Sequence, residues 1–198
     1  MLKARSAALF AAGWFTACAT PPSTTDAVQA LQNAAAGPLQ VELQTGGALA
    51  AAGVPVAVGD LPRAVSVAID TIQPGGEPHT LQRVIQDGDE LYRSTKRYVD
   101  GDATSWRSVL LDGDGTVRER SHSLPRLELP ASVAAQIERA VRGAIQRVDA
   151  VQGDPGAEWF RAYIRHGDAR WVVDCTRGGA IRRRARILTS ELWVAAKP

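Results

Sequence analysis

Two stretches of the chain share one pattern of hydrophobic and polar positions. Each opens with Leu-Pro, at Leu61 and at Leu129, and continues with apolar residues at helical spacing. Val65 and Ile69 follow the first Leu-Pro, and the same residue types recur 68 positions later, the step from Leu61 to Leu129. Proline in a first helical turn leaves no hydrogen bond unmade. The pattern predicts two helices, each with one apolar stripe to bury.

Alternating segments separated by turn residues follow each helix. Asp87-Gly88 suits a hairpin turn, because Asp-Gly tolerates positive φ angles. The predicted strands are residues 81–86, 90–98, 105–111 and 116–122, then 145–151, 158–165, 170–175 and 180–188. We therefore predict an α+β fold: two tandem helix-plus-antiparallel-meander units, residues 61–124 and 129–188, with the helices packed on one sheet face and the other face open.

The flanking segments are less regular. In residues 26–60, Asp26 can cap a helix over 27–36, and alternation over 39–43 predicts a half-buried strand. Residues 48–52 fit no single pattern, and 54–58 can form a short strand. The tail, residues 189–198, continues the last strand or adds an edge strand.

The first 17 residues have the features of an export signal. Lys3 and Arg5 precede nine apolar residues, 7–15, too few to span a bilayer as a helix. The run ends in Phe-Thr-Ala-Cys18, which resembles the lipobox of bacterial lipoproteins, although Phe15 stands where that family usually has Leu. The resemblance implies cleavage before Cys18 and a diacylglycerol on its sulfur. Ala17-Cys18-Ala19 also fits an ordinary cleavage site, which would give a soluble periplasmic or secreted protein.

The residues after Cys18 set the expected location. Ala19 in place of Asp implies, by the same resemblance, an outer-membrane lipoprotein of a Gram-negative cell, facing the periplasm. Residues 18–25 form a tether, extended by Pro21-Pro22. In such an oxidising compartment Cys175 has no intramolecular partner, and we expect it to be buried as a small apolar residue.

Charge and motifs exclude several classes of function. The 198 residues carry 23 basic and 21 acidic side chains; removing Lys3 and Arg5 leaves 23 − 2 = 21 bases, a neutral chain that does not suit nucleic acid. The histidines show no metal-ligand spacing, and the Asp112-Gly-Asp-Gly turn does not fit an EF-hand frame. No nucleophile elbow or phosphate loop occurs. We expect no catalytic residue, metal or cofactor, and hence no enzyme.

The helix pattern Leu-Pro-x-x-Val-x-x-x-Ile, followed by a meander with a Gly-containing last turn, resembles PepSY-like domains. The tandem arrangement is similar to that of secreted β-lactamase inhibitor proteins. The resemblance spans about residues 61–188 and implies an exported, non-catalytic protein that inhibits or modulates peptidases or envelope proteins. The second unit departs from the first, because residues 174–179 replace its Asp-Gly-Asp-Gly turn.

Aromatic and arginine side chains on the predicted strands are candidates for partner binding. Trp159 and Phe160 are adjacent, so one of them must point away from the helix. Alternation places three arginines of strand 180–188 on one face, either as a solvated outer face or as a basic stripe that binds an acidic partner or lipid headgroups. The candidates are Trp159, Phe160, Trp171, Tyr92, Trp106, Arg182, Arg184 and Arg186.

These patterns together predict a lipid-anchored, non-catalytic periplasmic module that binds an envelope protein through an exposed, concave sheet face and acts as an inhibitor or modulator of an envelope enzyme. A structural or assembly factor of the outer envelope is the alternative. The membrane contact would be the lipid on Cys18 alone.

Overall fold

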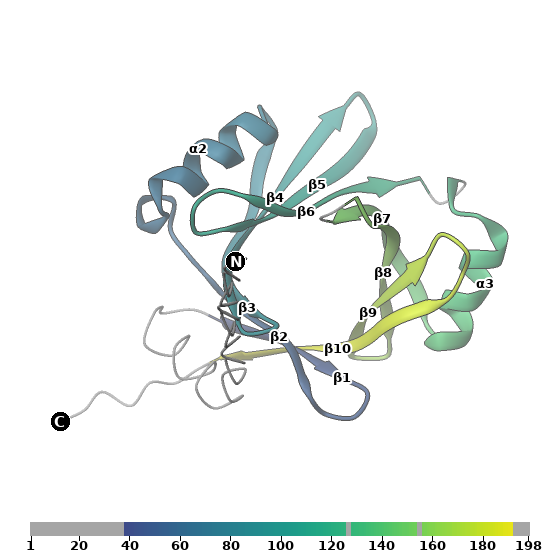
Figure 1. The fold of residues 1–198 in the computed structure, drawn as a ribbon. Coiled ribbons are helices and arrows are strands. Elements are labelled where there is room, and N and C mark those ends of the chain that lie inside the picture. Colours follow the sequence, from purple (N-terminus) through teal and green to yellow (C-terminus); the bar gives the residue numbers. More distant parts are fainter. Residues whose placement is uncertain (1–37, 126–127, 154–155, 192–198) are drawn as a thin grey trace, which may run out of the picture.

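Ten antiparallel strands close into one barrel in the computed structural model, which describes residues 38–125, 128–153 and 156–191 (Figure 1). Around the ring the order is β1-β10-β9-β8-β7-β6-β5-β4-β3-β2, and β2 pairs with β1. The strands are β1 Pro38–Gln44, β2 Leu49–Pro55, β3 Glu77–Gln86, β4 Asp89–Asp100, β5 Ala103–Asp112, β6 Val117–Leu124, β7 Ala144–Gly153, β8 Glu158–His166, β9 Ala169–Thr176 and β10 Ile181–Glu191.

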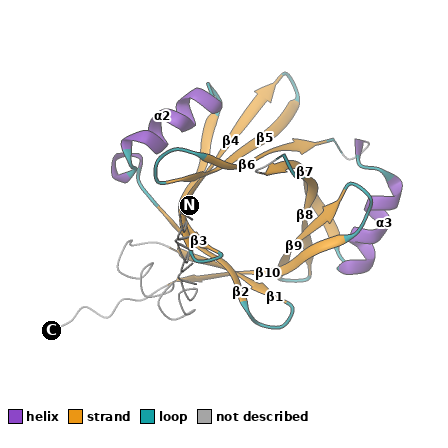
Figure 2. Ribbon diagram, in the orientation of Figure 1, coloured by secondary structure: helices purple, strands orange, loops and turns teal. Residues whose placement is uncertain are grey.

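The described helices lie outside the ring (Figure 2). They are α2 Arg63–Ile72, α3 Ala131–Ala140 and the short 3-10 helix Val58–Asp60. Pro62 and Pro130 occupy the N-cap positions of α2 and α3, as the Leu-Pro pattern leads one to expect. None of the helices within the described ranges is long and apolar enough to cross a membrane.

The predicted fold class is wrong. We expected two α+β units with one sheet face left open, but the strands of both stretches belong to a single closed sheet. The order helix then four strands does occur twice, as α2-β3-β4-β5-β6 and α3-β7-β8-β9-β10. Closure comes from β1 and β2, which join β3 to β10. The concave face is therefore the inside of a barrel.

The main apolar cores lie between the helices and the outer surface of the barrel. Val65 and Ile69 of α2 pack against Val109 and Leu111 of β5 and against Tyr92. A second core joins α3 to β7, β8 and β9; its buried members include Val133, Ile137, Val148, Ala162, Ile164, Val173 and Cys175. Each helix thus buries the stripe that its sequence predicts, and that burial is the main favourable term for its docking.

The inside of the barrel holds charged side chains beside a small apolar cluster of Ala50, Val172 and Ala185. Arg93 of β4 contacts Glu42 of β1, although β3 and β2 separate these strands in the sheet, so the contact crosses the interior. Arg161 of β8 reaches Glu119 of β6 across β7 in the same way. Because side chains alternate along a strand, the residues next to these face outward, toward the helices. The two larger apolar clusters therefore lie outside the barrel, under the helices, and the charges share the inside with a smaller apolar cluster.

The segments before Leu61 that were hard to place from the sequence form the two strands that close the barrel. The ambiguous residues 48–52 belong mostly to β2, and residues 39–43 lie within β1. The predicted export signal, the tether with Cys18 and the helix 27–36 lie outside the described residues, as does the tail beyond residue 191.

Candidate functional site

Six charged residues form one connected chain of ion pairs inside the barrel. We call it the interior charge chain; its members, in order of contact, are Arg93, Glu42, Arg183, Asp174, Arg161 and Glu119. They come from six different strands, β4, β1, β10, β9, β8 and β6. Three arginines face three carboxylates, so the chain is neutral.

Asp174 is the centre of the interior charge chain. Arg161 donates from Nε and Nη2 to its two carboxylate oxygens at 2.8 and 3.0 Å, and Arg183 donates from Nε at 3.1 Å. Burial alone would raise the pKa of Asp174, but the two guanidinium groups hold it below its ordinary value. The carboxylate is therefore an ion at neutral pH.

The pKa of Arg161 is affected by the same balance. Burial disfavours its charge, yet Glu119 and Asp174 raise its pKa well above the ordinary value. Arg183 continues the chain by donating to Glu42 at 3.0 Å. An arginine binds each of the three carboxylates of the interior charge chain, so none of them is available as a general base. We interpret the interior charge chain as structural.

A second interior pair lies nearer the other end of the barrel. Arg147 sits 4.2 Å from the ring of Tyr163, and its Nε is 3.0 Å from Oδ1 of the fully buried Asp149. Burial raises the pKa of Asp149, with Arg147 and Arg161 opposing the shift. Burial also raises the pKa of the Tyr163 phenol.

A cavity of about 370 Å³ opens at one end of the barrel, above the interior charge chain. Trp159 lines it, and the guanidinium of Arg182 lies 4.7 Å from the indole ring. The acids and bases deeper in the cavity are already paired with one another. A charged ligand would have to break those pairs, so this cavity is a weak candidate site.

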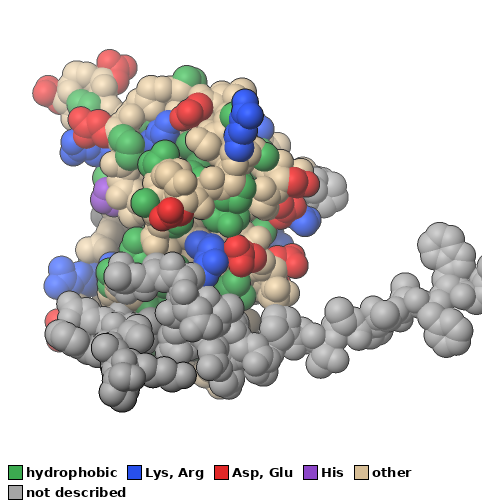
Figure 3. Space-filling view, turned by 90° about the vertical axis from the view of Figure 1, so that its left-hand side faces the viewer, with side chains coloured by type: hydrophobic (Ala, Val, Ile, Leu, Met, Phe, Trp, Pro, Cys, Tyr) green, Lys and Arg blue, Asp and Glu red, His purple; other side chains and the backbone are tan. Residues whose placement is uncertain are grey.

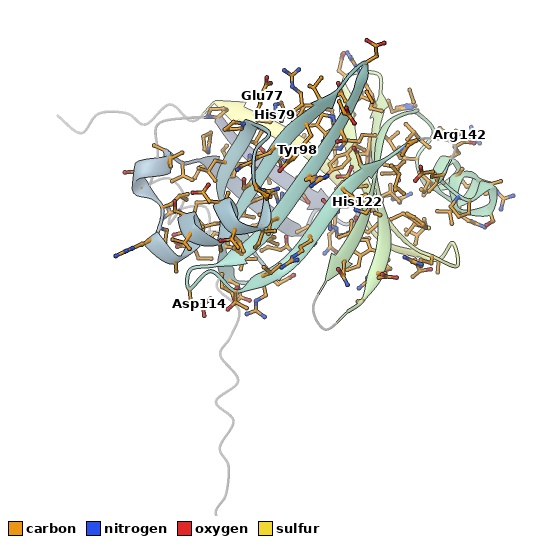
Figure 4. All side chains as sticks on the ribbon, turned by 90° about the horizontal axis from the view of Figure 1, so that it is seen from above. Glu77, His79, Tyr98, Asp114, His122 and Arg142 are labelled. Atoms are coloured by element: carbon orange, nitrogen blue, oxygen red, sulfur yellow. The ribbon has the colours of Figure 1, made fainter. Side chains whose placement is uncertain are left out.

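The larger hollow, of about 570 Å³, lies on the outer surface of the barrel. We call it the outer groove. It crosses strands β5 to β8 between the two helices, where neither α2 nor α3 covers the sheet; Figure 4 shows His122 of β6 on this surface. The side chains on this face and at its ends are Gln73, Arg107, Arg120, His122, Gln152, Glu158, Phe160 and Arg177.

The outer groove carries an excess of positive charge. Arg177 pairs with Glu158 at 2.8 Å, the one acidic side chain among its lining residues. Arg107 lies over the ring of Tyr98, 4.5 Å from the centroid, and forms no ion pair within the described part of the chain. Arg120 is exposed and likewise has no carboxylate partner there. Among the described residues, therefore, neither of these two arginines has a carboxylate partner.

Gln73 brings a buried polar atom to the border of the outer groove. Gln73, at the C-terminal end of α2, is only 2% exposed. Its Nε2 donates to the carbonyl of Arg107 at 2.8 Å, while Oε1 accepts no hydrogen bond from the described residues. Elsewhere the surface is more balanced: on the α2 side, side chains of both signs are interspersed (Figure 3).

The structure places the five aromatic residues among the predicted partner-binding residues in four different settings. Phe160 and Trp159 line the outer groove, with Phe160 against the α3 core and Trp159 pointing away from that helix. Trp171 packs in the α3 core, and Tyr92 is buried under α2, where its hydroxyl donates to Glu90. Trp106 contacts His79 with ring centroids 4.5 Å apart. These aromatics do not form one surface.

The three candidate arginines also separate. Arg182 stacks on Trp159, Arg184 donates to Thr45 and to the carbonyl of Ala140, and Arg186 is exposed on β10. A register shift between Ile181 and Arg183 takes Arg182 out of the stripe that alternation predicted, while Arg184 and Arg186 keep a common outer face. Arg183 shares its face with Ala185 and Ile187, and because that face lies inside the barrel, Arg183 joins the interior charge chain.

The sequence did contain a signal for part of this arrangement. Arg93 and Arg161 are 161 − 93 = 68 residues apart, the same step that relates the two helices. Both follow an aromatic residue within a predicted strand, and burial of such a charge costs free energy unless it is paired. Cys175 is buried and unpaired, as predicted, and burial raises the pKa of its thiol.

Comparisons with known proteins give similar structures and no matching family. No protein-family model matches the chain, and no curated protein matches it at a significant level. A DUF2874 family protein from Bacteroides uniformis is 17% identical, with a TM-score of 0.44 over 63% of this chain and 88% of its own. A BLIP-like protein from Bacteroides fragilis is 14% identical, with a TM-score of 0.39 over 69% of this chain and 92% of its own.

Proposed function

We propose that this chain is a non-catalytic binding protein of the bacterial envelope, which holds an acidic segment of a partner protein in the outer groove. The two uncompensated arginines, Arg107 and Arg120, are the observation that carries the proposal. Guanidinium groups bind carboxylates through paired hydrogen bonds, and arginine is enriched at the centres of interfaces. Phe160 adds an apolar contact beside them.

The closed sheet favours side-chain recognition over strand addition. Each of the ten described strands is hydrogen-bonded to a neighbour on both sides, so none offers a free edge to an extended peptide. The concave face that the sequence suggested as the docking surface is inside the barrel and filled by paired charges. The partner must therefore contact the outside.

The location is part of the proposal. The leader of residues 1–17, followed by Cys18, supports export and lipid attachment, with the folded part held in the periplasm by the tether of residues 18–25. An inhibitor or modulator of an envelope enzyme would act by this kind of surface contact.

The test is a charge reversal in the outer groove. We would screen an array of acidic peptides for binding to the mature protein. The affinity of the tightest peptide would then be measured by fluorescence anisotropy for the wild type and for the variant Arg107→Glu/Arg120→Glu. The matched control is Arg139→Glu/Arg142→Glu, which reverses two charges beside α3. We expect the groove variant alone to lose peptide affinity at least about tenfold, equivalent to about 1.4 kcal/mol of binding free energy. Binding of the peptide to the wild type should also weaken in high salt. Equal binding by all three proteins, or no binding by any, would refute the proposal.

A further inference from the structure

One row of side chains crosses the outer groove at right angles to its strands. Arg107 of β5 lies opposite His122 of β6. His122 in turn lies opposite Ala150 of β7, which lies opposite Phe160 of β8. Directly opposed residues share one face of a sheet, and all four line the groove. Neighbouring strands are about 4.8 Å apart, so the row is about 14 Å long from Arg107 to Phe160. We call it the groove row.

The β5 and β6 end of the groove row is positively charged. Arg120 lies two residues before His122 on β6 and shares its face, so it is the diagonal neighbour of Arg107. Neither arginine has a carboxylate partner within the described ranges. An acidic side chain placed here meets two guanidinium groups at once.

Arg107 is held in position in the absence of a ligand. Its guanidinium lies 4.5 Å from the centroid of the Tyr98 ring, and its backbone carbonyl accepts a hydrogen bond from Gln73. Tyr98 in turn lies against Gly76, where φ is +72° and a Cβ atom would come within 2.8 Å of the ring. Figure 4 shows Tyr98 and His122 on the strands to either side of β5. A guanidinium fixed in this way loses little conformational entropy on binding a carboxylate.

The β8 end of the groove row is apolar and has no excess charge. Phe160 packs against the α3 core, which holds its ring at this end. Glu158, on the same strand, pairs with Arg177 at 2.8 Å, so their charges offset each other. Ala150 has the smallest side chain of the row and leaves space above the sheet beside Phe160. The two ends therefore favour different side chains of one ligand.

We infer that the outer groove binds an extended peptide segment in which an acidic residue and an aromatic residue are four positions apart. The acidic side chain binds Arg107 and Arg120, and the aromatic ring lies over Ala150 against Phe160. This inference rests on the proposed function and specifies the segment that the groove selects.

The length of the groove row sets the spacing. An extended chain advances about 3.3 Å per residue, so four positions span about 13 Å and match the row, whereas two positions span only about 7 Å. Side chains of an extended segment alternate between its two sides, and residues four positions apart point to the same side. Both can then face the sheet together.

Peptides of one composition test the spacing. Each carries one Glu and one Phe in a neutral polar background, at two, four or six positions apart and in both chain orders. Titration of the isotope-labelled mature protein, followed by NMR amide shifts, gives the affinities. We expect a four-position peptide to bind at least about fivefold more tightly than the two- and six-position peptides, because only there does the Phe ring contact Phe160.

A substitution in the floor of the groove row tests the place of the aromatic ring. Ala150→Gln fills the space beside Phe160 and should lower the affinity of the four-position peptide to that of the two-position peptide. The matched control is Ala144→Gln, the same substitution at an exposed position of β7 outside the groove, which should leave the advantage intact. The spacing series on the wild type decides the inference even where a variant fails to fold.

The outcomes separate this inference from the proposed function. If all spacings bind equally while Arg107→Glu/Arg120→Glu weakens every peptide, the inference is wrong and the proposed function stands. If that variant weakens none of them, the proposed function fails and the inference with it. A four-position advantage that survives Ala150→Gln in a folded variant would also overturn the inference.

Discussion

At the scale of single residues, the structure is defined by where it puts charge. Arg161 is 7% exposed and Asp174 is 6% exposed, and each depends on the other for compensation. Such pairs add little net stability compared with an apolar pair, but the loss of one partner leaves an isolated charge in a region of low dielectric constant. The interior charge chain should therefore tolerate single substitutions poorly.

Asp174→Asn should lower the free energy of unfolding by about 3–5 kcal/mol at pH 7, because two buried guanidinium groups lose their shared carboxylate. The lowered pKa of Asp174 means that its stabilisation is complete above the ordinary pKa and is lost as the pH falls through it toward the folded-state pKa. The gap between wild type and variant should narrow below about pH 4. Urea titrations of both proteins at pH 7 and pH 3 measure this difference in unfolding free energy. The same difference at both pH values would contradict a stabilising role for the Asp174 carboxylate.

Asp149→Asn should show the opposite dependence on pH. The raised pKa of Asp149 means that the folded chain binds its proton more tightly than the unfolded chain does. As the pH falls from neutral through that raised pKa, the wild type should gain stability relative to the variant. The same urea titrations, taken in steps between pH 7 and pH 4, would detect this convergence or crossing. Parallel profiles would show that the carboxyl is not buried.

At the scale of elements, the sequence predicted most of the local structure. Both helices begin behind their Leu-Pro pairs, and all eight predicted strands overlap the observed strands β3 to β10. Helical stripes and Asp-Gly turns are local signals, so a single sequence is enough to find them. On β10, Arg184 and Arg186 keep the common face that alternation predicts, whereas a bulge between Ile181 and Arg183, which no residue type announces, takes Arg182 out of the stripe.

Buried and exposed positions of α2 should differ sharply when truncated. Ile69 is 7% exposed in the α2 core, whereas Val67, two residues earlier, is 58% exposed. We expect Ile69→Ala to cost about 2–5 kcal/mol of unfolding free energy and Val67→Ala about 0.5 kcal/mol or less. Chemical denaturation of the two variants decides the point. Similar losses at both positions would mean that α2 does not dock through this stripe.

At the scale of the whole molecule, closure depends on a contact that local patterns cannot show. Arg183 and Glu42 lie 141 residues apart in the chain, and their hydrogen bond accompanies the pairing of β10 with β1. Alternation in β1 indicated a strand but gave no information about its neighbour. Closure also turns the concave face inward, and for this reason our proposed partner contact is assigned to the outer groove.

The pairing of β1 with β10 is the central claim, and NMR cross-strand contacts test it most directly. In isotope-labelled mature protein we expect nuclear Overhauser effects between opposed residues of the two strands, including Glu42 with Ile187 and Gln40 with Thr189. Amide hydrogens along β1 should also exchange slowly, because a paired strand is protected. If β1 shows no contact with β10 and its amides exchange at the rate of an open edge, the sheet is not closed and its concave face is open to a partner.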